Sequence, residues 1–338
     1  MSPRKKNVTA KDIARACGLS QATVSYVMNN KEGKKISEAT RRLVLQTARE
    51  LNYIPNSTAR SMRTNRSMSI GVVTGWNNLS MGFSLVLRGV KEYLDAAGYS
   101  ITLLHDDVNA KNDHEYVRYY RSARIDGLLF LFYEMEPETM ALLQRERIPF
   151  FLVDESGVWH TADQSHTLLE DGIRQAVSLC RERGFRRLKF FSLQRGDSLF
   201  SKKWNLFSRA IQEEFPQAEL QRLVFPAHGE KNEGLREQFY QALCQDPPDA
   251  AISSNPRTGW LVQGAILRRE FSLPPSVRHI CLAASGIFEL VYPTITCLDM
   301  PLEEMGKYAA RQIVRSLSGL PVEEHTFACA LKEGHSTQ

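Results

Sequence analysis

Residues 8–29 read VTAKDIARACGLSQATVSYVMN, and this stretch predicts two short helices joined by a tight turn. Thr9 and Asp12 have the spacing of a capping box, so a first helix is expected over residues 10–17. Gly18 supplies the backbone freedom of the turn, and Ser20 is a good N-cap for a second helix that ends near residue 29. Apolar side chains are spaced to form a small core between two crossing helices: Ile13, Ala14, Cys17, Leu19, Val24 and Val27.

A third helix is expected after Ser37, ending near residues 52–53, with an apolar stripe of Leu43, Val44, Ala48 and Leu51. Periodicity alone fits a generic three-helix module as well as a DNA-binding one. The second helix, however, exposes short or polar side chains and no acid. This composition suits a helix that lies in a major groove with its N-terminal residues near the base edges. The exposed residues are Gln21, Ala22, Ser25, Tyr26 and Asn29.

The charge of the 338-residue chain is unevenly placed. Residues 1–66 hold 14 Lys and Arg against four acids, a net charge of +10, whereas the other 272 residues carry a net charge of −5. Such asymmetry is expected where one part of a protein meets a polyanion and the other does not. A basic surface that is merely solvated would give the same count, so the pattern within the module has to decide.

Four motifs resemble the lactose-repressor (LacI/GalR) family in its order and spacing: VTAKDIA at 8–14, GLSQATVS at 18–25, TRR at 40–42 and ELNYIPN at 50–56. The resemblance implies a homodimeric transcriptional regulator, expected to be a repressor, that binds a pseudo-palindromic operator in double-stranded DNA. It places Gln21 and Ala22 at the main base-reading positions. Tyr26 stands where the family usually has arginine, so the operator is expected to differ from the family's commonest half-site.

A hinge is expected over residues 56–66, because Pro55 would end the third helix and Asn56 would cap a new one over residues 57–63. Seven residues are too few to be helical alone in water, and the residues by themselves favour a flexible basic linker. The resemblance instead implies a helix that folds on DNA, with Met62 as an apolar wedge in the minor groove. The residues expected to contact DNA are Thr9, Ser20, Gln21, Ala22, Thr23, Ser25, Tyr26, Asn29, Asn56, Arg60, Met62 and Arg63.

Residues 67–338 alternate apolar runs with amphipathic helices, which predicts two α/β lobes built on parallel sheets. The lobe nearer the headpiece is expected to hold residues 67–162 and 298–324, and the other lobe residues 163–297 and 325–338, with one last strand over residues 327–332. The resemblance extends to this core, which would be periplasmic-binding-protein-like. The complete prediction is therefore a small all-α headpiece over residues 1–55, the hinge, and a bilobed core that dimerises and binds an effector.

In such a core a small molecule binds between the lobes, beyond the carboxyl ends of the strands. The resemblance carries over Asp154 as an acceptor for effector hydroxyls, Asn255 as a polar contact, and Lys203 near the family's ligand-gripping arginine. Ser285 is the polar group nearest to an expected acid that is absent, and Trp76 is placed to stack on a sugar or base. The alternative for each is a surface polar group or a core aromatic residue; the ligand-facing role is favoured for Asp154 and Asn255, and the two alternatives stay open for Lys203, Ser285 and Trp76. The effector is expected to be a sugar or another metabolite, or to be absent.

Other classes of protein find little support in the sequence. There is no G-x-S-x-G elbow, P-loop, H-E-x-x-H or G-x-G-x-x-G motif, and no enzyme activity, cofactor or metal is expected. No apolar stretch approaches the length of a membrane span, and the N-terminus lacks a secretory signal. The six scattered cysteines are expected to be buried, reduced thiols of a cytoplasmic protein. The alternative left open is a ligand-independent DNA-binding regulator with a vestigial effector cleft.

Overall fold

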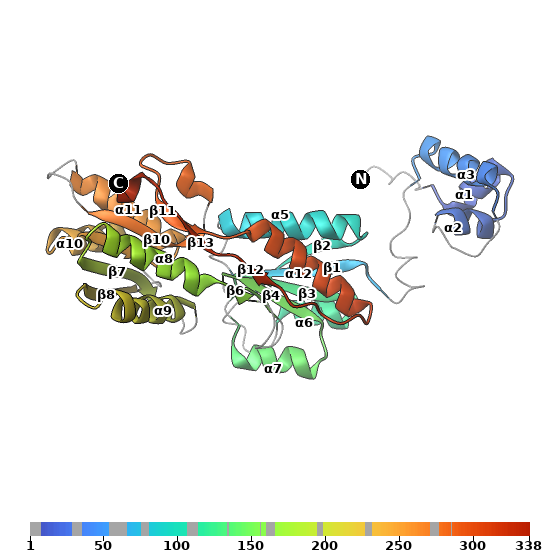
Figure 1. The fold of residues 1–338 in the computed structure, drawn as a ribbon. Coiled ribbons are helices and arrows are strands. Elements are labelled where there is room, and N and C mark those ends of the chain that lie inside the picture. Colours follow the sequence, from blue (N-terminus) through green and yellow to red (C-terminus); the bar gives the residue numbers. More distant parts are fainter. Residues whose placement is uncertain are drawn as a thin grey trace. The chain divides into compact units, whose positions relative to one another are not determined.

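The computed structural model divides the chain into two compact units, Met1–Ser67 and Met68–Gln338, which are described separately (Figure 1). It describes residues 8–28, 36–53, 66–75, 81–106, 114–133, 135–155, 157–159, 166–194, 199–226, 232–270, 277–284 and 286–338. Seven residues with a predicted role lie outside the described residues: Asn29, Asn56, Arg60, Met62, Arg63, Trp76 and Ser285.

The first unit contains the helices α1 (Ala10–Cys17), α2 (Gln21–Met28) and α3 (Glu38–Glu50). The Asp12 carboxylate accepts hydrogen bonds from the backbone N–H of Thr9 at 2.9 Å and from its hydroxyl at 2.7 Å, so the predicted start of α1 is confirmed. Gly18 ends α1 in the left-handed conformation, with φ at +65°, which glycine adopts without strain. The helix–turn–helix predicted from the local sequence is therefore present.

Six buried side chains form the core of this unit: Ile13, Ala14, Val24, Val27, Val44 and Ala48. Cys17, Leu19 and Leu51 are partly buried around it, as expected. The prediction that Leu43 belongs to the apolar stripe of α3 is wrong, because its side chain is exposed. The buried face of α3 follows Val44, Ala48 and Leu51 at helical spacing, and Leu43 lies about 100° away from Val44 around the helix axis.

The second unit contains a seven-stranded sheet in the order β12-β6-β5-β4-β3-β1-β2. Strands β1 to β4 are parallel, whereas β5 pairs antiparallel with both β4 and β6. The strands are β1 (Ser69–Gly75), β2 (Ser100–Asp106), β3 (Gly127–Leu131), β4 (Phe150–Asp154), β5 (Gly157–Trp159), β6 (His166–Thr167) and β12 (Thr326–Phe327). The helices packed with this sheet are α5 (Met81–Ala96), α6 (Glu115–Arg121), α7 (Pro137–Arg145) and α12 (Leu302–Leu317).

The same unit contains a six-stranded sheet in the order β13-β11-β10-β9-β7-β8, parallel except for β13. Its strands are β7 (Arg187–Gln194), β8 (Glu219–Pro226), β9 (Ala250–Ser253), β10 (Arg278–Ala284), β11 (Thr296–Asp299) and β13 (Ala330–Lys332). The helices of this lobe are α8 (Leu169–Glu182), α9 (Leu199–Glu214), α10 (Asn232–Cys244) and α11 (Pro256–Glu270), with the 3-10 helices η1 (Gly286–Glu289) and η2 (His335–Thr337).

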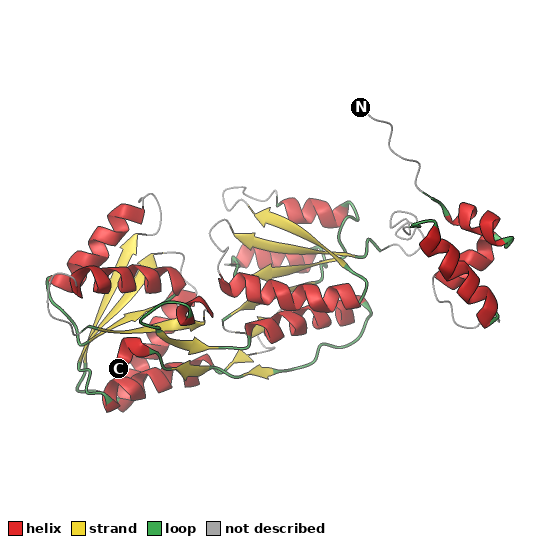
Figure 2. Ribbon diagram, turned by 90° about the horizontal axis from the view of Figure 1, so that it is seen from above, coloured by secondary structure: helices red, strands yellow, loops and turns green. Residues whose placement is uncertain are grey.

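Helices cover both faces of each sheet (Figure 2). Along β3, Leu128 and Phe130 join the core on one face, while Leu129 and Leu131 join the core on the other. Because side chains on both faces of such a strand are buried, the strand appears in the sequence as a continuous apolar run. The predicted fold class, two α/β lobes with mostly parallel sheets behind a helical headpiece, is confirmed.

The chain crosses between the sheets three times: from β6 to α8, from β11 to α12, and from β12 to β13. The prediction of one final strand over residues 327–332 is wrong. Phe327 pairs with Thr167 in the seven-stranded sheet, and Leu331 pairs with Leu298 in the six-stranded sheet. Only residues 328 and 329 lie between β12 and β13, and they carry the chain from one lobe to the other. The apolar core also continues through these crossings and includes Leu169, Leu298, Met300 and Phe327.

Helices α5 and α12 approach each other most closely at two glycines. A Cβ atom on Gly89 would lie 1.9 Å from the carbonyl oxygen of Glu303, and one on Gly306 would lie 2.1 Å from that of Val86. Neither backbone can move aside without separating the helices. The two glycines therefore set the spacing of this helix pair.

Gly89→Ala is expected to lower the free energy of unfolding by about 3 kcal/mol, because the added methyl group overpacks a backbone contact. Gly264→Ala is the matched control, since nothing lies within 4 Å of its Cβ position on α11. That control should raise stability by up to about 1 kcal/mol through helix propensity. Urea unfolding of both variants measures the difference. Equal stabilities for the two variants would contradict the close approach of α5 and α12.

Candidate functional site

The N-terminal end of α2 presents the predicted base-reading residues. Gln21 and Ala22 are exposed there. The Ser20 hydroxyl accepts a hydrogen bond from the backbone N–H of Thr23 at 3.1 Å and lies 2.9 Å from the Thr23 hydroxyl, so these two residues also cap the helix. The predicted N-cap is thus confirmed, and it leaves the side chains of Gln21 and Ala22 facing outward.

Two buried valines set the orientation of α2. Val24 and Val27 point into the three-helix core. Ala22 lies on the opposite side of the helix and Gln21 about 90° from the valines, and both are exposed. Ser25 and Tyr26, which were expected to be exposed, are half-buried. Helix α2 itself carries no charged residue. Exposed cations lie on the other two helices of this unit: Lys11 and Arg15 on α1, and Arg42 and Arg49 on α3.

Two acidic residues stand at the end of β4 in the second unit. Asp154, the last residue of the strand, is half-buried, and Glu155 follows it directly and is buried. The Glu155 carboxylate accepts a hydrogen bond from the Nζ of Lys203 on α9. The same Nζ donates to the carbonyl oxygen of Ser254 at 2.9 Å. The structure thus places Lys203 in a buried ion pair between elements of the two lobes.

Asn255 caps α11. Its Oδ1 accepts from the backbone N–H of Thr258 at 3.0 Å, and its Nδ2 donates to the Ser254 hydroxyl at 3.2 Å. Its backbone N–H donates to the Thr258 hydroxyl at 3.0 Å. Lys203 and Asn255 therefore meet around Ser254, at the carboxyl end of β9 where a ligand residue was predicted. Both already bind groups of the protein.

Sequence reasoning missed Glu155 and Ser254. The sequence did contain one signal for Glu155, because it is a second acid after the apolar strand 150–153 and directly follows Asp154, the residue that was predicted. Lys203 carried a second signal, since it is a charged residue on the face of α9 that also holds Phe207 in the core. What the sequence did not contain was the pairing of two residues 48 positions apart.

Ser253, His279 and Gln263 form a hydrogen-bonded chain in the six-stranded sheet. The Ser253 Oγ lies 2.9 Å from His279 Nε2, and Gln263 Oε1 lies 3.0 Å from His279 Nδ1. Serine hydrolases have a hydrogen-bonded chain of the same kind, in which a serine nucleophile contacts a histidine base and a third side chain orients that histidine. Here all three are buried and closed off from substrate, and burial lowers the pKa of His279 to about 3. The chain is a structural network that satisfies buried polar groups.

Four of the six cysteines are buried as predicted, whereas Cys17 and Cys244 are only partly buried. Burial raises the pKa of Cys180, Cys281 and Cys329 to about 12. Thiols with such pKa values hold little thiolate at neutral pH, and the thiolate is the reactive form. These three cysteines therefore serve as packing residues.

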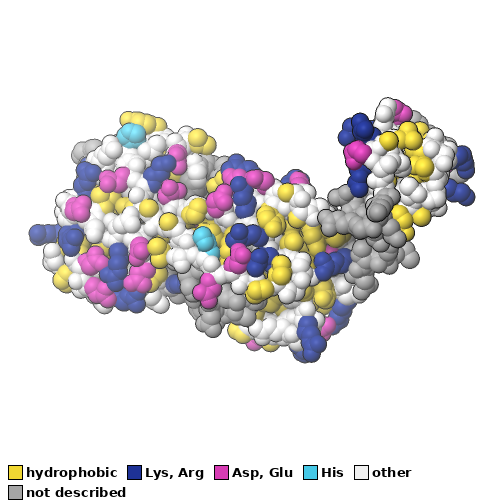
Figure 3. Space-filling view, turned by 45° about the vertical axis from the view of Figure 1, so that its right-hand side comes forward, with side chains coloured by type: hydrophobic (Ala, Val, Ile, Leu, Met, Phe, Trp, Pro, Cys, Tyr) yellow, Lys and Arg dark blue, Asp and Glu magenta, His cyan; other side chains and the backbone are white. Residues whose placement is uncertain are grey.

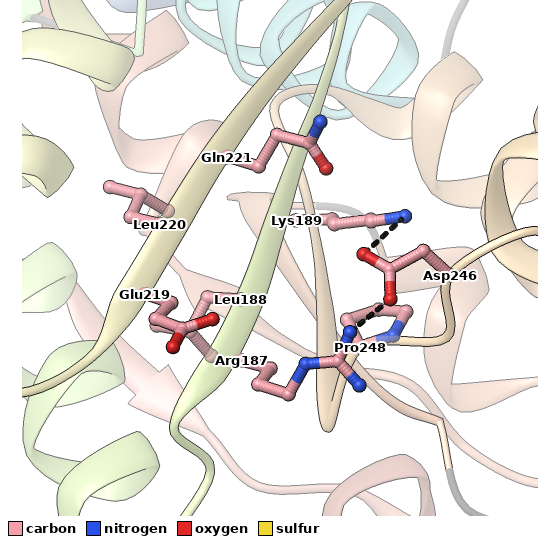
Figure 4. Close-up of a pocket in the computed structure, with 8 residues that line it drawn as sticks. All are labelled: Arg187, Leu188, Lys189, Glu219, Leu220, Gln221, Asp246 and Pro248. Carbon is pink, nitrogen blue, oxygen red and sulfur yellow. Dashed lines mark hydrogen bonds and ion pairs between the residues drawn. The ribbon is translucent and has the colours of Figure 1, made fainter.

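A cavity of 260 Å³ lies at the starts of β7 and β8, at the opposite end of the six-stranded sheet from Asn255 (Figure 4). The Asp246 carboxylate lies between Arg187 and Lys189, and its hydrogen bond with Arg187 lowers its pKa. Lys189 is buried and donates to the carbonyl oxygen of Ala242 at 2.9 Å. The polar groups of this cavity bind one another and fix the end of α10, so it is not the predicted effector site.

Basic and acidic side chains are interspersed over the face of the second unit seen in Figure 3. Arg174, for example, binds Glu213 at 2.7 Å and Glu170 at 3.0 Å, and it also pairs with Glu214. No helix within the described ranges combines the length and hydropathy needed to cross a bilayer. The same residues contain no group of three His, Cys, Asp or Glu side chains that could hold a metal ion.

Comparison with known proteins matches both units. Residues 9–56 match the family model of bacterial regulatory proteins of the lacI family, and residues 177–337 match the periplasmic binding protein-like domain. Residues 9–56 therefore form a DNA-binding domain of the lacI family. The resemblance inferred from the sequence is confirmed, and the protein is a DNA-binding transcriptional regulator.

Relatives and solved structures are similar to this chain along nearly its whole length. The PurR transcriptional repressor of Photobacterium profundum is 29% identical over 320 residues, covering 94% of this chain and 95% of PurR. A lac repressor dimer bound to operator and the anti-inducer ONPF has a TM-score of 0.78 at 19% identity, covering 98% of this chain and 99% of that one. A complex of the regulator CelR with cellobiose has a TM-score of 0.63 at 20% identity, covering 98% and 100%. All three are transcriptional regulators or repressors.

The burial of His279 predicts an acid-dependent loss of stability. Its pKa in the folded state lies well below the ordinary value of 6.5, so the unfolded chain takes up a proton that the folded chain does not. The contribution of His279 to the free energy of unfolding is fully present above pH 6.5 and decreases as the pH falls from 6.5 toward 3. Between pH 7 and pH 5 the parent should lose about 2 kcal/mol more than His279→Gln. Urea unfolding at the two pH values measures this, and parallel losses would contradict the assignment.

Proposed function

We propose that this LacI-family regulator is a repressor that binds a pseudo-palindromic DNA operator as a homodimer, with its affinity modulated by a small molecule bound between the lobes. The supporting observation is the outward face of α2. It is uncharged, begins at a capped helix N-terminus, and stands among exposed cations of a small basic unit. Such a face suits reading base edges while the surrounding cations contact phosphates.

In this proposal Gln21 and Ala22 read bases, and Ser20, Thr23, Ser25, Tyr26 and Thr9 contact the operator nearby. Asn29, Asn56, Arg60, Met62 and Arg63 remain predicted contacts, the last four in the hinge over residues 56–66. Tyr26 offers one hydroxyl in place of the paired donors of an arginine, so the operator should lack the guanine that such an arginine contacts. The predicted boundaries of headpiece, hinge and core are part of the proposal.

Dimerisation is supported by exposed apolar side chains on the second unit. Leu290 and Tyr292, just after η1, are 78% and 84% exposed, and Trp260 of α11 is partly exposed beside Phe288. Leu103 is exposed on β2, the edge strand of the seven-stranded sheet. A second copy of the chain would cover these side chains. A pseudo-palindromic operator follows, because two headpieces related by a two-fold axis read two half-sites.

Gln21→Ala should weaken binding to the operator about tenfold or more, since it removes a side chain that can make a bidentate contact to a base. The probe is a labelled duplex selected by the parent chain from a random library, and fluorescence anisotropy gives the affinity. Gln46→Ala is the matched control, because Gln46 is equally exposed but lies on α3 and binds Glu50 of its own helix. Losses of equal size in the two variants would remove α2 from the reading face.

In this proposal the effector binds between the lobes, where Asp154, Lys203 and Asn255 lie near strand ends of the two sheets. Trp76 and Ser285 remain predicted residues of the same site. The cellobiose complex of CelR supports a sugar or a similar metabolite. A second candidate is a ligand-independent regulator. It is favoured by the ion pair between Lys203 and Glu155, because the cation expected to grip a ligand already binds a carboxylate of the protein.

A thermal-shift screen against sugars, nucleosides and other metabolites separates the two candidates. An effector should raise the melting temperature of the parent chain, and Asp154→Ala should abolish that rise because it removes an acceptor for ligand hydroxyls. Asp95→Ala is the control, since Asp95 is an exposed acid of α5 that pairs with Lys91. A ligand whose effect survives Asp154→Ala would place the site elsewhere, and a screen without any shift would favour the ligand-independent regulator.

A further inference from the structure

One buried ion pair joins the two lobes of the second unit. Lys203 lies on α9, whose Trp204 and Phe207 rings contact Phe190 of the six-stranded sheet. Glu155 follows β4 of the seven-stranded sheet. The Lys203 side chain is 0% exposed and that of Glu155 is 9% exposed. The two charges therefore meet away from solvent, one from each lobe.

The position of the ammonium group is set by its own lobe. Lys203 Nζ donates to the carbonyl oxygen of Ser254, which follows β9, so the cation is held on the side of the six-stranded sheet. Two buried thiols, Cys281 and Cys329, lie close enough to feel the charges of the pair. Neither is ionised at neutral pH, since burial raises both thiol pKa values to about 12. The Glu155 carboxylate is thus the anionic partner that reaches Lys203 from the other lobe.

Burial makes the two charges depend on each other. A buried ammonium or carboxylate without a counter-charge carries a large desolvation penalty, and removing one partner of a buried pair is strongly destabilising. Separating the lobes would return both groups to water. The arrangement in which the lobes bury this pair is therefore favourable only when both charged groups are present, or when neither is.

We propose that Glu155 acts as an internal ligand of Lys203, and that this ion pair latches the two lobes together without a bound small molecule. In this latch Glu155 binds Lys203, the cation that the family resemblance assigns to ligand binding. This inference rests on the proposed function only where lobe arrangement is linked to operator affinity. The latch itself is a property of the second unit and can be tested without DNA or effector.

The test is a distance between spin labels, one on each lobe of the full chain. Gln144→Cys on α7 and Gln212→Cys on α9 provide exposed, uncharged sites. The partly buried native thiols are removed by Cys17→Ser and Cys244→Ser. Labelled chains are mixed with an excess of unlabelled chain, so that double electron–electron resonance records distances within one chain. The parent should give one narrow distance distribution.

Glu155→Gln and Lys203→Met should each shift the distribution to longer and broader distances, because each leaves one buried charge unpaired. The double variant should return to the narrow parental distribution, since neither charge of the pair remains. Arg88→Met is the control; it breaks an exposed ion pair with Glu303 inside one lobe and should leave the distance unchanged. Circular dichroism confirms that each variant is folded.

Two results would overturn the latch. Single variants that keep the parental distance would show that the pair does not hold the lobes. A folded double variant as open as the single variants would assign the opening to lost packing and not to charge. Neither result bears on operator binding, so failure of the latch and failure of the proposed function are distinguishable.

Discussion

Burial of Val24 and Val27 is the constraint on which DNA reading by this regulator depends. Among the residues that the structure describes, the three-helix core holds six buried side chains, and two of them belong to α2. Because these valines face inward, Ala22 on the opposite side of α2 faces outward, and Gln21 is exposed beside it at the end of the helix that the Ser20 cap holds in place. A core this small leaves little choice of orientation, so the side of α2 that meets solvent is determined before any DNA is present.

The second unit faces a different constraint, since its two lobes are built from non-contiguous segments. Three crossings and a shared apolar core connect the sheets, and the pair between Lys203 and Glu155 adds a charged contact between them. Apolar contacts at the crossings are compatible with several lobe arrangements, whereas a buried ion pair is satisfied only when its two atoms meet. This difference is the reason for proposing the pair, and not the apolar core, as the latch between the lobes.

Local signals in the sequence predicted local structure well. The capping box at Thr9, the glycine after α1 and the apolar runs of the strands each act within a few residues, and the structure confirms them. Features that depend on distant pairing were missed: the antiparallel strand β5, the division of residues 326–332 between two sheets, and the partner of Lys203. Leu43 was misplaced because an apolar residue beside a buried stripe cannot be told from a member of it by type alone.

The central claim is that two copies of the basic unit insert α2 into successive major grooves of one duplex. Hydroxyl-radical footprinting of the full chain, on a duplex that it has enriched from a random library, tests this most directly. The account predicts two protected half-sites related by two-fold symmetry, with centres about one helical turn apart. Protection of a single half-site without a symmetric partner, or no sequence enriched at all, would contradict it.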